Sequence, residues 1–195
     1  MPGLRYLCGG LLLSVSSACA AVVVEEPIGM TPLQIDADEW EGNWEGHVSG
    51  EEDAIVGTIE VLDVSSGILR AVWIENGEPH STRIYLLEAG DWMFASVPAA
   101  GPDLPYGPDS QEAADVEYVW ARFERAGDAV FAWEPDVGKF RELVESGLLP
   151  GRAEEGRFSD VLLGTLDMDH YAFLASEEAG IPFEWDGGLV LVRSR

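Results

Sequence analysis

The hydrophobic pattern between residues 44 and 133 predicts a series of β-strands. Six segments are rich in β-branched and aromatic residues, and turn residues lie between them. These segments are 55–64, 68–75, 80–88, 92–97, 118–125 and 129–133. Asn76-Gly77 is typical of a tight hairpin turn, because both residues tolerate a positive φ. Neighbouring strands are therefore expected to pair antiparallel.

A repeated motif indicates two further hairpins. The pattern A-G-D-x-x-F-A-x-x-P begins at Ala89 and again at Ala126, and each copy has the composition of a turn followed by a return strand. The proline that ends each copy cannot donate another ladder hydrogen bond. Between the two copies, the Pro- and Gly-rich segment 98–115 is expected to form a long loop.

The pattern changes to a helical period in the last third of the chain. Val137, Phe140 and Val144 recur at helical spacing, and the segment 167–178 is also helix-like, with Asp167 as its N-cap. An apolar run at 189–192 predicts a final strand. The sequence therefore predicts an α+β fold that is mostly β. We expect an antiparallel up-and-down meander that forms a barrel or curled sheet, with two short C-terminal helices and late strands.

The first twenty residues predict export. Arg5 provides a positive start, residues 6–15 are mostly apolar, and a run of small residues surrounds Cys19. Cleavage after Ala20 would release a free periplasmic or secreted protein. Cleavage before Cys19 would leave a lipid on that cysteine, and Ser16-Ser17-Ala18-Cys19 resembles a bacterial lipobox. We favour the lipoprotein, anchored in a membrane and facing the periplasm or the cell surface.

The rest of the chain divides into two parts. In residues 21–34, two prolines and the glutamates before the first of them interrupt any regular hydrophobic pattern. We therefore expect this segment to be a linker. Residues 35–195 are expected to form a single β-rich domain. Both cysteines, Cys8 and Cys19, lie in the export segment. The mature domain therefore has no disulfide, no Cys-rich zinc site and no thiol nucleophile.

The charge of the chain excludes several partners. It has 36 acidic and 11 basic residues, a formal net charge of −25. Binding to nucleic acid or to anionic lipid through a basic patch needs Lys and Arg against phosphates, so we expect neither. We expect the acidic surface to keep the protein soluble, and the alternative is a surface that binds cations.

The sequence contains little that indicates catalysis. It has no G-x-S-x-G elbow, no H-E-x-x-H motif, no phosphate-binding Gly-rich loop and no dinucleotide fingerprint. Asp36-Ala37-Asp38 begins like a calcium loop, but Trp40 and Glu41 stand where a ligand and a glycine are required. Asp167, Asp169 and His170 offer ligand atoms for a metal, yet a capped helix start explains the same residues. We therefore predict no catalytic residue, no metal and no cofactor.

Two resemblances to known proteins can be stated. Gly42-Asn43-Trp44 resembles the G-x-W opening of lipocalin-type barrels, and the strands that follow fit the up-and-down order which that family implies. Segments of the C-terminal part, including Trp133-Glu134-Pro135-Asp136 and Phe183-Glu184-Trp185-Asp186, are similar to small exported proteins and lipoproteins of proteobacteria that are uncharacterised. The second resemblance implies no activity.

Aromatic and arginine side chains on the predicted strands are the candidate ligand-binding residues. They are Arg70, Trp73, Arg83, Trp120, Arg122 and Trp133. Aromatic side chains inside a closed barrel can hold one small apolar ligand, and the alternative is that they fill the core. The arginines could face an anionic group of the ligand or form ion pairs with Glu60, Glu75 or Glu124.

The sequence therefore favours an envelope protein that is not an enzyme. We expect it to bind a small apolar or anionic ligand, or another envelope protein, and to contact the membrane only through its lipid anchor. One alternative is a periplasmic hydrolase that uses acidic residues on a cell-wall or sugar substrate, which converging carboxylates would favour. The other alternative is a structural spacer with a filled core.

Overall fold

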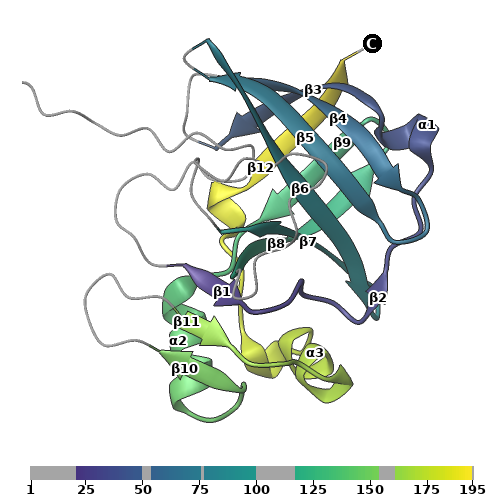
Figure 1. Ribbon diagram of the computed structural model, residues 1–195. Coiled ribbons are helices and arrows are strands. Elements are labelled where there is room, and N and C mark those ends of the chain that lie inside the picture. Colours follow the sequence, from purple (N-terminus) through teal and green to yellow (C-terminus); the bar gives the residue numbers. More distant parts are fainter. Residues whose placement is uncertain (1–20, 50–53, 76, 100–116, 154–160, 195) are drawn as a thin grey trace, which may run out of the picture.

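Eight antiparallel strands form a closed barrel in the computed structural model, which describes residues 21–49, 54–75, 77–99, 117–153 and 161–194 (Figure 1). The barrel strands are β3 (Gly42–Val48), β4 (Ile55–Asp63), β5 (Ile68–Glu75), β6 (Glu78–Ala89), β7 (Trp92–Pro98), β8 (Tyr118–Ala126), β9 (Ala129–Trp133) and β12 (Leu189–Ser194). Strands β3 to β9 pair in chain order, and β12 closes the barrel by pairing with both β9 and β3. The predicted mostly β fold with an antiparallel meander is confirmed.

The turns between these strands also follow the sequence. All six predicted strands are present, and their bounds differ from the predicted ones by at most two residues. Gly77 has a φ of +85°, as the predicted hairpin turn requires, while Asn76 lies outside the described residues. Most of the predicted loop 98–115 also lies outside them, and Pro98 is the last residue of β7.

Helix α1 (Ala37–Trp40) lies at one end of the barrel, which we call the α1 end. The Trp44 side chain is fully buried there, and its indole N–H donates to the Trp40 carbonyl at 2.9 Å. The Trp40 ring contacts both the Trp44 ring at 6.1 Å and the Phe123 ring at 6.0 Å. The Arg125 guanidinium lies 5.5 Å from the Trp40 ring. Tightly packed aromatic side chains therefore fill this end of the barrel.

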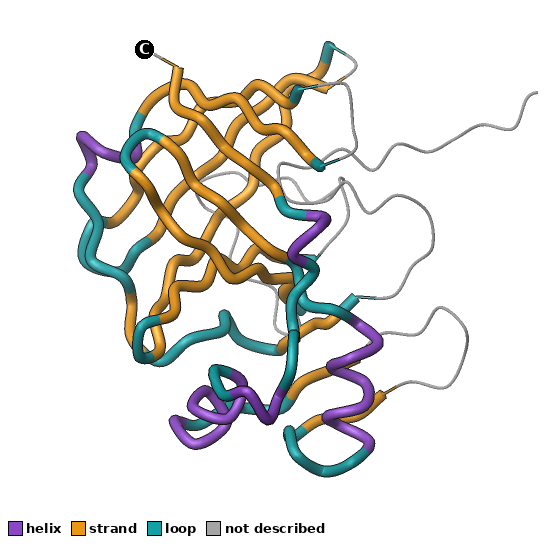
Figure 2. Tube along the Cα trace, turned by 180° about the vertical axis from the view of Figure 1, so that it is seen from behind, coloured by secondary structure: helices purple, strands orange, loops and turns teal. Residues whose placement is uncertain are grey.

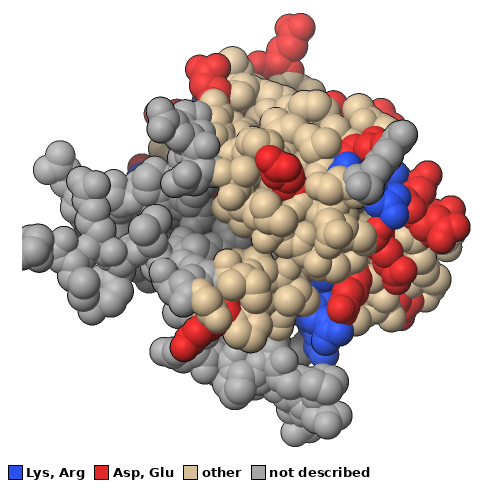
Figure 3. Space-filling view, turned by 90° about the horizontal axis from the view of Figure 1, so that it is seen from above, with Lys and Arg blue, Asp and Glu red and all other residues tan. Residues whose placement is uncertain are grey.

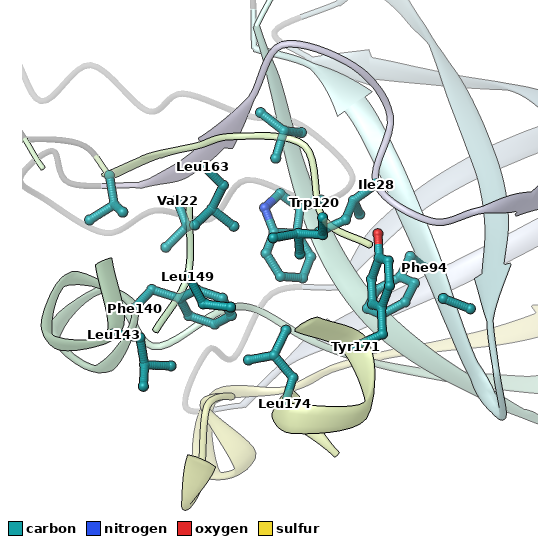
Figure 4. Close-up of a cluster of buried hydrophobic side chains, with 14 of the residues drawn as sticks. Val22, Ile28, Phe94, Trp120, Phe140, Leu143, Leu149, Leu163, Tyr171 and Leu174 are labelled. Atoms are coloured by element: carbon teal, nitrogen blue, oxygen red, sulfur yellow. The ribbon is translucent and has the colours of Figure 1, made fainter. Parts of the chain in front are cut away.

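A second layer packs on the barrel, below it in Figures 1 and 2. It consists of β1 (Val22–Val24), β10 (Gly151–Ala153), β11 (Val161–Leu163), α2 (Val137–Glu145), α3 (Met168–Leu174) and the 3₁₀ turn η1 (Glu177–Ala179). Strand β1 pairs parallel with β11 and antiparallel with β8, so the small sheet continues from a barrel strand. Buried side chains on the outer face of β7 and β8 meet the helices in a second core that includes Phe94, Trp120, Phe140 and Tyr171 (Figure 4).

Residues 21–34 belong to the fold, contrary to the predicted linker. Val22, Val23 and Val24 are 3–5% exposed in β1, and β2 (Thr31–Pro32) pairs with β6. The Ile28 N–H donates to Ser96 Oγ at 3.0 Å. Gly29 has a φ of +129°, and a Cβ at this position would lie 2.3 Å from Leu87 Cβ. Prolines and glutamates interrupt the local pattern, but the partners of this segment lie far away in the sequence, so the pattern could not reveal them.

The predicted helices are present, with one difference in length. Asp167 caps α3 as predicted, because its Oδ1 accepts from the N–H groups of Asp169 and His170, both at 3.0 Å. The helix ends at Leu174 instead of residue 178, and the Ser176 hydroxyl donates to the Phe173 carbonyl at 2.6 Å where the chain turns. Within the described residues, every helix is too short or too polar to cross a membrane.

Candidate functional site

The six candidate residues lie on different surfaces of the fold and do not form one site. Trp73 faces the barrel interior, Arg70 and Arg83 lie on the outer wall, and Trp120, Arg122 and Trp133 lie on the outer side of β8 and β9. Side chains alternate between the two faces of a strand. Ala121 on β8 and Ala132 on β9 face the barrel interior, so the residues next to them in the chain point outward. The structure brings only Arg122 and Trp133 into contact with each other as a cation and a ring.

Two of the three candidate arginines, Arg70 and Arg122, form ion pairs that the sequence offered as an alternative to a ligand. Arg70 and Arg83 are cross-strand neighbours, and Arg70 Nε donates to Glu60 Oε2 at 2.7 Å. Arg122 pairs with Glu124 at 2.5 Å. The side chain of Glu75 lies outside the described part of the structure.

Trp120 is a core residue. It is 3% exposed, and its ring packs against Phe140 at 5.5 Å, Phe94 at 5.9 Å and Phe183 at 6.0 Å. Its Nε1–H is buried without a hydrogen-bond partner within the described residues. Figure 4 shows Trp120 among apolar side chains of the second core, which indicates a packing role.

The barrel end opposite α1 is the candidate functional site, and we call it the loop end. There β3 leads to β4, β5 to β6 and β7 to β8, and the chain leaves the barrel after β9 and returns at β12. Trp73 and His80 are cross-strand neighbours near this end, and their rings stack with centroids 5.6 Å apart. Trp73 Nε1 is buried and finds no hydrogen-bond partner among the described residues. A buried donor of this kind costs about 1–3 kcal/mol, so an acceptor supplied by a ligand would stabilise the site.

A short ladder lies where the chain leaves and re-enters the barrel. Pro135 and Phe183 form an antiparallel bridge, and the Glu184 N–H donates to the Glu134 carbonyl at 2.9 Å. This register places Glu134 opposite Glu184, and alternation gives both glutamates the same face of the ladder. Burial raises the pKa of Glu134, and the neighbouring Glu184 carboxylate raises it further. The loop end therefore carries two carboxylates on one face of the ladder, and the charge of Glu184 opposes the ionisation of Glu134.

The other face of this ladder encloses Arg122. The register sets Trp133 opposite Trp185, the first residue of the 3₁₀ turn η2 (Trp185–Gly187), and their ring centroids are 4.7 Å apart. The Arg122 guanidinium carbon lies 4.7 Å from the Trp92 ring, 5.2 Å from Trp185 and 5.7 Å from Trp133. Burial lowers the pKa of Arg122, and the Glu124 carboxylate acts in the opposite direction. These cation–π contacts hold the ladder against β8 and so fix the two glutamates.

Other shifted pKa values have local structural causes. Hydrogen bonds from Ser65 lower the pKa of Asp63 in a turn, and the hydrogen bond from the His170 backbone lowers the pKa of Asp167 in the helix cap. Burial raises the pKa of Tyr171 in the second core, where its hydroxyl accepts the Gly29 N–H at 2.9 Å. Glu134 differs from these groups, because it lies at the surface and its pKa is raised by partial burial and by the Glu184 carboxylate, which makes it a candidate for a functional site.

The described residues offer no group of three or more His, Cys, Asp or Glu side chains that could hold a metal ion. His170 lies in the capping box, where its Nδ1 accepts the Asp167 N–H at 3.2 Å. Its position therefore has the structural explanation that the sequence offered as an alternative to a metal site.

Sequence reasoning missed several residues of the loop end and of the ladder. These are His80, Glu134, Glu184 and Trp185. One signal was present: Trp133-Glu134 and Glu184-Trp185 are the same two residues in reverse order. Antiparallel pairing of such segments matches tryptophan with tryptophan and glutamate with glutamate.

Acidic side chains dominate the charged surface in Figure 3, and the few basic groups lie beside acidic ones. No protein-family model matches this chain. A curated protein or a solved structure that matches it was not found either. The fold and the loop end define a closed eight-stranded barrel with a candidate site at one end.

Proposed function

We propose that the protein is an exported, lipid-anchored binding module of the cell envelope, and that its ligand binds at the loop end of the barrel. The observation that supports this most is the buried Trp73 Nε1–H, which has no acceptor within the described residues. An oxygen of a bound ligand would accept this hydrogen bond and remove the cost of the unpaired donor. The predicted likeness to lipocalin-type barrels is compatible with the closed barrel and with the burial of Trp44 at the start of β3.

The residues near Trp73 favour a small, mostly apolar ligand. The stacked Trp73 and His80 rings offer a flat surface, and the inward positions of the barrel include small residues such as Ala71 and Ala95. Glu134 and Glu184 would repel an anionic group at this end. Of the two ligand types expected from the sequence, the structure therefore supports the apolar one, provided that it carries an oxygen acceptor.

Native mass spectrometry tests this proposal on protein purified from its own envelope. We expect an additional mass on the wild-type protein and a smaller occupied fraction for Trp73→Phe, which keeps an aromatic ring but removes the N–H. Trp120→Phe is the matched control, because Trp120 also carries a buried Nε1–H without a partner but belongs to the second core. Only the apo mass in repeated preparations, or equal losses for both variants, would refute the proposed site.

The lipid anchor belongs to the same proposal. Strand β1 begins at Val22, three residues after Cys19, so a lipid on Cys19 would hold the domain within about 11 Å of the bilayer surface. The predicted flexible spacer would then be absent, and the domain would be confined to the membrane surface. An intact mass of the mature protein that begins at unmodified Ala21 would contradict the anchor and would leave the ligand site unaffected.

Glu134 and Glu184 favour a second candidate function, a hydrolase that acts on a cell-wall or sugar substrate. A carboxyl group with a raised pKa can donate a proton at a pH where its neighbour is ionised, which is the division of roles in many glycosidases. Incubation with isolated cell-wall glycan tests this candidate. Release of reducing ends that falls by about a hundredfold or more in Glu134→Gln would support it. No release by the wild-type protein would exclude this substrate class.

A further inference from the structure

The outer wall of β12, β3, β4 and β5 near the loop end carries almost no charge. Figure 3 shows a broad surface with few charged side chains on a chain whose net charge is −25. Three outward positions form one row across the strands, because Val192 pairs with Glu45 and Glu45 pairs with Val56. The next strand continues this row at Ile74, since Gly57 pairs with Trp73. We call the surface formed by Val192, Glu45, His47, Val56 and Ile74 the wall patch.

Large aliphatic side chains of the wall patch are exposed to solvent. Ile74 is 66% exposed, Val56 is 62% exposed and Val192 is 42% exposed. Val56 and Ile74 are neighbours on this wall, and Glu45 lies between Val56 and Val192 in the same row. Exposed apolar side chains grouped around a single acid in this way can form an interaction site in a soluble domain.

A twofold axis between two copies of the chain can bring the carboxylate of Glu45 in one copy next to the imidazole of His47 in the other. Glu45 and His47 lie on the same face of β3, with Oε1 and Nε2 3.2 Å apart, and their side chains are 45% and 53% exposed. Consider a twofold axis that runs across the strands in the plane of the wall and passes over Gly46 of β3. This axis would place Glu45 of each copy opposite His47 of the second copy. It would also set Val192 against Val190, which point outward from β12.

We propose that two copies of this chain associate through the wall patch, with their β3 strands antiparallel. Elsewhere the acidic surfaces of the two copies repel each other, so this wall, whose patch contains Glu45 as its single acidic residue, is the face on which the repulsion is weakest. Four strands and three rows of side chains cover about 400 Å² per copy, less than the ~800 Å² of a standard interface. The dimer is therefore weak, and salt strengthens it by screening the net charge.

Sedimentation velocity of the chain that starts at Ala21 tests the dimer. Between about 10 and 500 µM, the weight-average mass is expected to rise toward that of a dimer, and to rise further in ~300 mM salt. Val192→Glu should lower the association constant by about tenfold or more, because the axis sets Val192 against Val190 of the second copy. Val64→Glu is the matched control, because Val64 is 48% exposed but lies after the other end of β4, and it should change the constant by less than about twofold.

Charge reversal tests the twofold arrangement itself. Glu45→Lys should weaken association, and the double variant Glu45→Lys/His47→Glu should restore it to within about threefold of the wild type. A chain that stays monomeric at all these concentrations and at both salt levels would overturn the proposal. So would equal effects of Val192→Glu and Val64→Glu, or failure of the double variant to restore association. None of these results depends on whether a ligand binds at the loop end.

Discussion

Replacement of Ser96 with alanine tests whether residues 21–34 belong to the folded domain. Ser96 is fully buried on β7, and its Oγ accepts the Ile28 N–H at 3.0 Å. Ile28 itself is 4% exposed, so water cannot take the place of the lost acceptor. The substitution removes one atom and introduces no steric conflict, which leaves the unpaired N–H as its main effect.

The expected loss of stability follows from that unpaired donor. A buried N–H without an acceptor costs about 1–3 kcal/mol. For a domain of this size, each kcal/mol shifts Tm by about 2–4 °C, so the melting temperature should fall by roughly 2–12 °C. If residues 21–34 were a free linker, the Ser96 hydroxyl would be buried without this donor, and alanine would be neutral or stabilising. The sign of the change therefore distinguishes the two structures.

Urea unfolding of the chain that starts at Ala21, followed by tryptophan fluorescence, measures this change. We expect a lower midpoint at an unchanged m-value for Ser96→Ala. Ser81→Ala on the half-buried outer wall of β6 is the control and should change stability by less than about 0.5 kcal/mol. A midpoint for Ser96→Ala that equals or exceeds that of the wild type would show that the segment does not pack against β7.

Three further predictions concern charged groups. Arg122→Met should destabilise the domain by about 1–2 kcal/mol in urea and alter its near-UV circular dichroism, because Trp92, Trp133 and Trp185 lose their cation. The pKa of Glu134 is raised above 4.5, so its ionisation destabilises the fold as the pH rises through that raised value. Glu134→Gln should therefore be more stable than the wild type at pH 7, and the difference should vanish below pH 4.5. The pKa of Asp167 is lowered below 3.8, so Asp167→Ala should be less stable at pH 7 and should converge with the wild type in urea midpoint as the pH falls below 3.8.

Local sequence signals predicted the barrel strands and their turns because each of these depends on neighbours in the chain. The segments 68–75 and 129–133 were predicted with the observed bounds of β5 and β9, since turn residues flank both. The cap at Asp167 follows from its position before a helical period, and it is observed. Side chains that hydrogen-bond to backbone groups two or three residues away can be inferred from sequence alone.

The inner and outer faces of the strands could not be assigned from the sequence. On β8, alternation puts Trp120 and Arg122 on one face and Ala121 and Phe123 on the other, but both faces are largely buried. The rule that the apolar face points inward therefore gives no answer here. The structure places small residues such as Ala121 inside and most of the tryptophans outside, because the second layer covers the outer face of β8. Of the three candidate tryptophans, only Trp73 therefore faces the barrel interior.

The route of the chain between β9 and β12 determines which parts of the protein can carry the candidate site. Strand β12 supplies the hydrogen bonds that both β9 and β3 need, so a fragment that stops after β9 would leave two open strand edges. The same return path brings Glu184 opposite Glu134 and places Trp185 over Arg122. The same segment of the chain therefore closes the barrel and completes the ladder that carries Glu134 and Glu184. Because β1 pairs with both β8 and β11, the smallest unit that can hold the site extends from β1 to β12.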